Sequence, residues 1–287
     1  MGMKKPFVLE IAKNTYAINE FGLVTMYLLV GEESALLIDT GCGACDLKGL
    51  VAELTDKPYR VVLTHGHLDH SGGVEAFDEV YLGEGDFKMI RDLDFDDLEM
   101  NFEVMVNYLD LQGKRGSYEV YDYTPDCIHP FERIPKLTAV HDGDIFDLGN
   151  RRGGGIEVPG HFPGGICLLD ETSGSLFSGD ACNINLIVAG CSANTALRGL
   201  DHLKEYDGRY KQMFNGHIGY AGAPTCFSQP ETVLDDCIHI LECVLNHTDT
   251  PDVGDFLWEK RIGMNYGSAR VSYDPNRLYD EGEKPVR

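Results

Sequence analysis

Four apolar stretches of the chain run directly into turns that contain glycine and side chains of the kind that bind metals. They are VVLTHGHLDHSGG from Val61, VPGHFPGG around His161, LFSGDAC around Asp180 and FNGHIG around His217. Runs rich in branched and aromatic residues predict strands, and glycine allows the backbone to turn tightly after each one. Strand ends at one edge of a sheet lie close together, so the pattern requires a sheet fold that gathers four distant turns.

The order of the predicted elements favours an α/β architecture, because strand patterns alternate with helix patterns. Strands are expected at 14–18, 23–30, 35–39, 60–64 and 79–82, and again at 137–140, 144–148, 155–158, 166–170, 175–178 and 212–215. Helices are expected at 47–54, at 194–206 and from Pro230 to about Asn246, where proline and acids begin the helix. The tail from Gly267 predicts one late strand and a turn.

The stretch 84–135 differs from its surroundings, because apolar residues at helical spacing alternate with many acids. We interpret it as a helical lid inserted into the domain, although an ordinary surface helix pair explains the pattern equally well. With 287 residues, of which 43% are hydrophobic, the chain is expected to form a single domain over 1–287. A C-terminal helix and tail over 223–287 would complete it.

The formal charge of -23 argues against nucleic acid and anionic membrane surfaces as partners, and favours a small-molecule substrate. The nine cysteines are scattered and odd in number, which indicates free thiols in a reducing cytosol. Cys42 and Cys45 form a CGAC stretch, for which plain thiols are a better interpretation than a redox pair. No signal peptide or spanning run is evident, so a cytoplasmic protein is expected, and a homodimer is compatible with the sequence.

The four turns supply five imidazoles and two carboxylates, a combination typical of a metal centre. The residues are His65, His67, Asp69, His70, His161, Asp180 and His217. A catalytic zinc ion takes three protein ligands and keeps one position open, so seven ligands suit two divalent ions that share one carboxylate. Nitrogen and oxygen donors fit Zn²⁺ best, and Mn or Fe is chemically compatible. A structural zinc site is a weaker interpretation, because such sites favour closed, cysteine-rich shells.

On these motifs the chain resembles the metallo-β-lactamase superfamily. The residues that carry the resemblance are H-G-H-L-D-H at 65–70, P-G-H at 159–161, S-G-D at 178–180, G-H at 216–217 and Asp39 in LLIDTG. The resemblance implies a four-layer αββα sandwich, with two mixed β-sheets face to face, helices outside and the metals at one edge. It implies a first metal on His65, His67 and His161, and a second on Asp69, His70 and His217. Asp180 would bridge the ions, and Asp39 would hold ligands by hydrogen bonds from behind.

Two positions depart from the family pattern. Phe162 stands where members commonly have threonine after the histidine of the third motif, and Ile218 separates the last histidine from Gly219. Neither change touches a ligand, but both weaken any transfer of substrate identity.

The resemblance implies a binuclear metal-dependent hydrolase that uses a hydroxide shared by the ions, with Asp69 as the catalytic residue that holds or relays its proton. We expect it to cleave a small ester or thioester, as in thioesterases of the glyoxalase II kind. A lactonase or a phosphodiesterase is an alternative, although lactonase relatives have tyrosine where this chain has Asn183. An iron-dependent oxygenase acting on sulfur compounds, and a ligand sensor on an inactive scaffold, also remain open. Four residues are candidates for the substrate pocket: Phe87, Tyr108, Asn183 and Tyr220.

Overall fold

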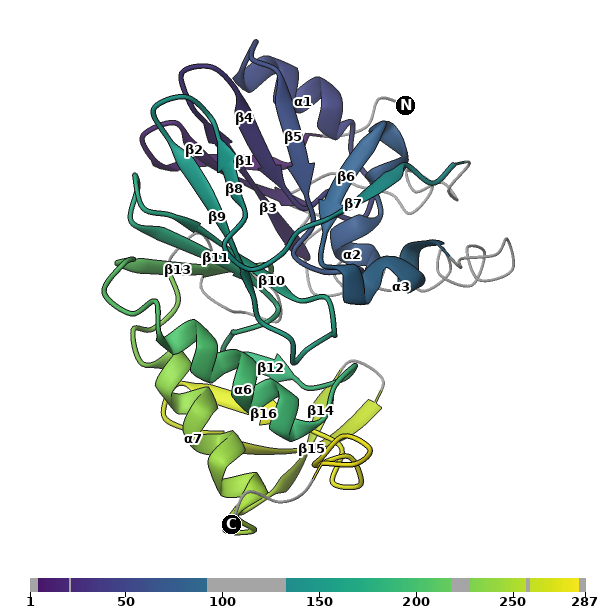
Figure 1. The fold of residues 1–287 in the computed structure, drawn as a ribbon, viewed down its shortest axis with the longest axis vertical. Helices are drawn as coiled ribbons and strands as arrows, with labels where there is room; N and C mark the ends of the chain where they lie inside the picture. The colour runs from purple at the N-terminus through teal and green to yellow at the C-terminus, as the bar shows by residue number, and fades with distance from the viewer. Residues whose placement is uncertain (1–4, 21, 92–132, 218–227, 257–258, 284–287) are drawn as a thin grey trace.

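The computed structural model describes residues 5–20, 22–91, 133–217, 228–256 and 259–283. In these ranges the strands form three mixed sheets (Figure 1). The first sheet has, in spatial order, β1 (Phe7–Ala12), β2 (Thr15–Glu20), β3 (Val24–Val30), β4 (Ala35–Ile38), β5 (Tyr59–Val62), β6 (Glu79–Leu82) and β7 (Lys136–Ala139). It is antiparallel from β1 to β4 and parallel from β4 to β7.

The second and third sheets are also mixed. The second has the order β13 (Gln212–Asn215), β11 (Ser175–Gly179), β10 (Ile166–Asp170), β9 (Arg152–Glu157) and β8 (Ile145–Asp147), with β11 and β13 parallel. The third has the order β12 (Asn185–Ile187), β16 (Ala269–Ser272), β15 (Glu259–Tyr266) and β14 (Asp252–Phe256), with β12 and β16 parallel. Parallel neighbours place the ends of their strands at one edge, where turns from distant parts of the chain can meet.

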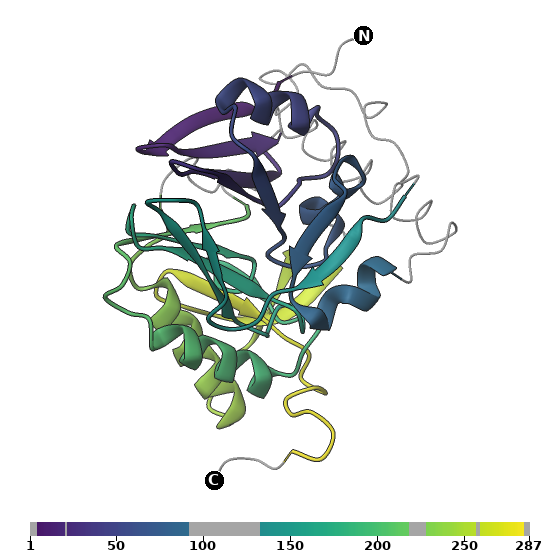
Figure 2. The ribbon, with the colours of Figure 1, turned by 45° about the horizontal axis from the view of Figure 1, so that its top comes forward.

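The helices lie outside the paired sheets. Helix α1 (Leu47–Leu54) covers the outer face of the first sheet, and α6 (Ala193–Lys204) and α7 (Val233–Leu245) lie beyond the second sheet, against the third. Figure 2 shows the first sheet in purple and blue facing the teal second sheet, with the two green helices on the far side. Short helices α2 (Leu68–Ser71), η1 (Val74–Ala76), η2 (Glu84–Asp86) and α3 (Phe87–Arg91) follow the strands β5 and β6.

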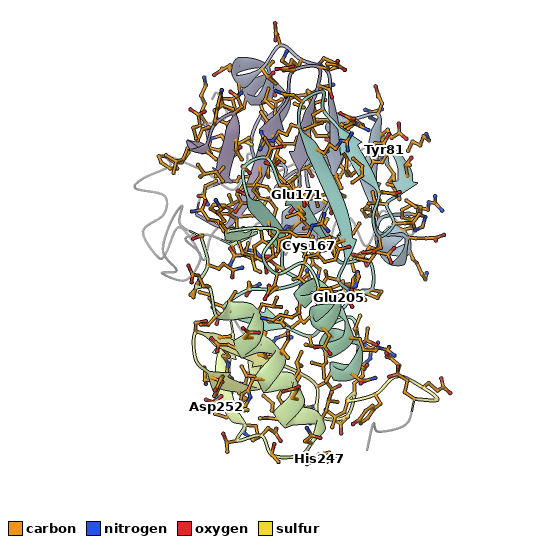
Figure 3. All side chains as sticks on the ribbon, turned by 60° about the vertical axis from the view of Figure 1, so that its left-hand side comes forward. Tyr81, Cys167, Glu171, Glu205, His247 and Asp252 are labelled. Atoms are coloured by element: carbon orange, nitrogen blue, oxygen red, sulfur yellow. The ribbon has the colours of Figure 1, made fainter. Side chains whose placement is uncertain are left out.

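Apolar residues alternate between two cores along the central strands, which is why the sheets stack. On β10, Ile166 and Leu168 face the space between the first and second sheets, while Cys167 and Leu169 face α6 and α7. Strand side chains alternate with a period of two, so a continuous apolar run supplies both faces of a sheet covered on both sides. In Figure 3, Cys167 accordingly lies near the middle of the molecule, between Tyr81 on the first sheet and His247 beyond α7.

The predicted α/β class and αββα layering are confirmed, and the third sheet is an addition to the prediction. The late strand predicted in the tail from Gly267 is confirmed as β16, whereas β14 and β15, which precede Gly267, were not expected. β1 and β12 were also not expected. Of the predicted insertion 84–135, residues 84–91 form η2 and α3, and 92–132 lie outside the described residues.

The structure also bears on the cysteines and on membrane-spanning helices. The seven cysteines in the described ranges form no disulfide, and burial raises the pKa of the Cys42 and Cys45 thiols well above its usual value. Both thiols are therefore poor nucleophiles, which disfavours a redox role for the CGAC stretch. None of the helices in the described ranges combines the length and apolar character needed to cross a bilayer.

Candidate metal centre

Each predicted ligand follows the end of a strand, and the fold brings all seven together. His65 to His70 lie between β5 and the end of α2, His161 follows β9, Asp180 directly follows β11, and His217 follows β13. Their donor atoms form three groups. Within each group, the donor atoms all lie within 4.8 Å of one another. The groups are His65, His67 and His161; His65, His70 and Asp180; and Asp69, His70 and His217.

The first group consists of three imidazole nitrogens at short range. His67 Nδ1 lies 3.0 Å from His65 Nε2 and 3.0 Å from His161 Nε2. Zinc–nitrogen bonds of about 2.0–2.1 Å in a tetrahedral site separate two ligand nitrogens by roughly 3.3 Å. The three side chains are therefore close to the spacing that a single zinc ion requires.

The other two groups share His70, and Asp180 lies beside both. Asp180 Oδ2 lies 3.0 Å from His217 Nε2 and 3.7 Å from His161 Nε2, and Oδ1 lies 3.8 Å from His70 Nε2. Asp69 Oδ2 lies 3.4 Å from His217 Nε2 and 3.9 Å from His70 Nε2. The carboxylate of Asp180 thus stands between the first group and the Asp69 group, where a shared ligand would be placed.

One buried polar atom of the site shows that it fits a cation. Asp180 Oδ1 is buried and has no hydrogen-bond partner within the described part of the chain. A buried carboxylate oxygen without a partner costs free energy unless a cation or donor satisfies it. The residues present therefore fit a divalent cation, with Asp180 Oδ1 available to bind it.

Hydrogen bonds from outside fix how the imidazoles face the centre. The Nδ1 of His161 donates to Ile187 O at 2.6 Å, and the Nδ1 of His217 donates to Leu23 O at 2.8 Å. A carbonyl oxygen can only accept, so in each ring Nδ1 carries the hydrogen and Nε2 is the atom that faces the centre. Outer partners of this kind set the tautomer and the orientation of metal-binding histidines.

Asp39 holds two of the ligand segments at once. Its Oδ2 accepts from His70 Nδ1 at 2.8 Å and from Thr64 Oγ1 at 2.9 Å, and its Oδ1 accepts from Thr64 N at 2.6 Å. Thr64 Oγ1 in turn lies 3.2 Å from His65 Nδ1. Asp39 has φ +64°, a left-handed backbone that costs free energy for a non-glycine residue, as is common where function requires it. Asp39 therefore lies behind the cluster, bonded to His70 directly and connected to His65 through Thr64.

Burial and charge set the protonation of the cluster. Burial lowers the pKa of His65 and His161 below the usual value and that of His67 to about 3, so these rings are neutral at pH 7 and able to bind a cation. Burial would lower the pKa of His217 as well, but the Asp180 carboxylate raises it to about 10. Without ions, His217 thus keeps a proton that a bound cation would displace.

Phe162, the departure from the family pattern, lies against the first group. Its ring centroid is 4.3 Å from that of His67, at an interplanar angle of 66°, and its side chain is partly exposed. Gly190 makes room for it, because an added Cβ there would lie 2.9 Å from Phe162 Cδ1. Phe162 therefore forms an apolar wall beside the site where a threonine would offer a hydroxyl.

The predicted pocket residues are less well placed. Asn183 is buried, and its Oδ1 accepts from Asn185 N at 2.6 Å, which forms the turn before β12. Phe87 packs against the core between the first sheet and α1, with the Arg91 guanidinium 4.6 Å from its ring centroid. The positions of these two side chains give no support to a role in the pocket. Tyr108 and Tyr220 lie outside the described residues.

Replacing Gly216 with alanine is expected to disturb the candidate cation site around His70. An added Cβ would lie 2.4 Å from His70 Cε1, and this ring cannot move away because it is hydrogen-bonded to Asp39. We expect zinc affinity to fall by about 10–100-fold, as for other changes that displace a ligand from outside. Zinc titration against a chromogenic chelator measures this.

Gly154→Ala is the matched control, because its Cβ would make an ordinary contact of 3.6 Å with Ile145 Cδ1. Wild-type zinc affinity in Gly216→Ala would show that the His70 ring is not held as described.

Known proteins of one family match this chain in sequence. The family model described as the metallo-β-lactamase superfamily matches residues 19–188, which are more than half of the 287 residues and include six of the seven candidate ligands, all but His217. The acyl-coenzyme A thioesterase MBLAC2 of Homo sapiens is 30% identical over 170 residues, which cover 54% of this chain and 57% of that protein. The atrochrysone carboxyl ACP thioesterase of Aspergillus fumigatus is 28% identical over 202 residues, covering 68% and 49%. The matches thus span about half the length of these relatives.

Solved structures match in fold. A superfamily protein from Sulfolobus tokodaii has a TM-score of 0.51 at 21% identity, covering 82% of this chain and 85% of that one. A sec-alkylsulfatase from Pseudomonas sp. has a TM-score of 0.57 at 15% identity, covering 84% of this chain and 42% of that one. At these identities the likeness concerns the arrangement of the chain in space.

Proposed function

The chain belongs to the metallo-β-lactamase superfamily, and from this premise we propose that it is a hydrolase with two divalent metal ions, preferably zinc, that cleaves small thioesters. The observation that carries the proposal is the convergence of seven nitrogen and oxygen donors in three groups around the Asp180 carboxylate. In this assignment His65, His67 and His161 hold one ion, and Asp69, His70 and His217 hold the other.

The chemistry depends on an activated water. When bound at these residues, divalent ions would lower the pKa of a coordinated water from its bulk value towards ~7, so that hydroxide would be available at neutral pH. Asp69 has 16% of its side chain exposed and lies beside His217, so its carboxylate can accept the proton of the attacking water. The new carbon–oxygen bond replaces the carbon–sulfur bond, and the proton passes to the departing thiolate. Phe162 offers an apolar surface beside His67 against which part of a substrate can pack.

The thioester is favoured over other substrates by the relatives. MBLAC2 and the Aspergillus fumigatus protein are both described as thioesterases. Esters, lactones, phosphodiesters and an iron-dependent oxidation of sulfur compounds are the competing activities, and each has a distinct product. The centre consists of nitrogen and oxygen donors without thiolate, which is consistent with zinc.

The test is an activity panel on the protein prepared without metal and then loaded with zinc, manganese or iron. Release of free thiol from short acyl-thioesters and from acyl-coenzyme A is expected with zinc, and removal of the metal should abolish it. His161→Ala is expected to lose the activity, and His141→Ala, an exposed histidine outside the centre, should keep it. Oxygen uptake with iron, or faster turnover of lactones or bis-p-nitrophenyl phosphate, would contradict the proposal in favour of those activities.

A further inference from the structure

A buried carboxylate that the sequence analysis did not single out joins the two loops of the first metal group. Asp86, at the end of η2, is 1% exposed. Its Oδ2 accepts from Gly66 N at 2.8 Å, and its Oδ1 accepts from Gly164 N at 2.7 Å. Gly66 lies between His65 and His67, and Gly164 lies three residues after His161. One side chain thus connects the turn after β5 in the first sheet to the turn after β9 in the second.

The contact is close because glycines permit it. An added Cβ at Gly83 would lie 2.3 Å from Gly164 O, and one at Gly164 would lie 2.6 Å from Asp86 N. The backbone of η2 therefore rests directly on the loop that follows His161. Gly66 is held on its other side as well, since Ser71 Oγ donates to Gly66 O at 3.1 Å.

We propose that Asp86 is a positioning residue for one of the two ions, the one assigned to His65, His67 and His161. Both of its described hydrogen bonds go to backbone N–H groups, so it acts through the backbone of the two loops that carry the donor atoms. The other group has its own supports, because His70 is held by Asp39 and His217 by Leu23 O. The inference rests on the metal centre of the proposed function, but not on the identity of its substrate.

The geometry predicts a selective effect. Asp86→Asn keeps one acceptor oxygen and turns an amide N–H₂ towards a backbone N–H, so one of the two links is lost. Asp86→Ala loses both. We expect the affinity for one zinc ion to fall by about 10–100-fold, the range for outer partners of metal ligands, while the second ion binds as in the wild type.

The experiment titrates the full-length, metal-free protein with zinc against a chromogenic chelator, and locates bound zinc by anomalous diffraction from zinc-soaked crystals. Asp236→Asn is the matched control. Asp236 is also a buried carboxylate that joins two segments, accepting from Ser268 N and from Thr232 Oγ1 at 2.8 Å each, but it lies on α7. The Asp236→Asn variant should have a lower thermal stability and unchanged affinities for both zinc ions.

Selective loss of zinc from His65, His67 and His161 in Asp86→Asn supports the inference, and Asp86→Ala should show a larger loss. Wild-type affinities, or equal weakening of both ions, would overturn it, because a general loosening of the fold affects both sites. If the wild-type protein itself binds no zinc pair, the proposed function fails and this inference fails with it. A protein that binds two ions without cleaving thioesters leaves only the substrate assignment wrong.

Discussion

Asp180→Ala is expected to lower thioester hydrolysis by more than about 100-fold, the upper range for partners that merely orient a ligand. The reason is that Asp180 is the only carboxylate, among the described residues of the centre, within 4 Å of His70, His161 and His217 at once. Its loss removes the one group placed to serve both ions. Steady-state kinetics with saturating zinc, together with the zinc content of the purified variant, measure the effect.

Asp142→Ala provides the comparison for Asp180→Ala, because Asp142 is partly exposed and pairs with His202 on the surface. Its kinetics should match those of the wild type. Full activity in Asp180→Ala would mean that the centre works without a shared carboxylate, and the two-ion assignment would have to be abandoned.

Arg151→Met is expected to destabilise the protein by about 3–5 kcal/mol, because it leaves a buried carboxylate without its partner. The Arg151 side chain is 4% exposed and donates to Asp170 Oδ2 from Nη2 at 2.5 Å and from Nε at 3.0 Å. It also donates to Asn14 O at 2.8 Å and to Thr15 Oγ1 at 2.7 Å, and so joins the first sheet to the second. At about 2–4 °C per kcal/mol for a chain of this size, Tm should fall on the order of 10 °C.

The neighbouring residue supplies the control for this pair. Arg152 is 72% exposed on its side chain and lies 3.7 Å from Asp147, and surface pairs of this kind contribute about 0–1 kcal/mol. Arg152→Met should therefore change Tm little. The double variant Arg151→Met with Asp170→Leu should recover much of the loss, because no uncompensated charge remains. Equal Tm values for Arg151→Met and Arg152→Met in thermal unfolding would show that the buried pair contributes nothing special.

The sequence revealed the central strands and concealed the peripheral ones, for a physical reason. β3, β4, β10 and β11 are buried on both faces and read as continuous apolar runs, which predict strands well. β1 lies at a sheet edge with Phe7 46% exposed, and β14 and β15 (DVGDF and EKRIGMNY) are rich in charged residues. Strands of that kind form because a neighbour pairs with them, and a single sequence does not show the neighbour.

The same contrast holds at the candidate site. The clustering of the candidate ligands was predictable because His65 to His70 are crowded in one turn and the remaining candidates follow strand ends. Asp86 and Thr64 were not, because Asp86 acts through the backbone of Gly66 and Gly164, and Thr64 links the side chain of the distant Asp39 to His65. The only signal for Asp86 was an acid in the glycine-bearing LGEGD stretch. Phe87 was chosen for its aromatic ring, but it packs against the core between the first sheet and α1. Aromatic character alone does not tell which way a side chain points.

The donors are divided between two halves of the sandwich. His65 to His70 belong to a loop of the first sheet, whereas His161, Asp180 and His217 follow strands of the second. Neither half alone offers a complete set, so tight ion binding needs both halves docked in register. The free energy of ion binding would then add to the free energy of unfolding of the whole sandwich, because only the docked halves bind the ions tightly. During refolding, metal uptake would consequently mark the moment at which the halves close upon each other.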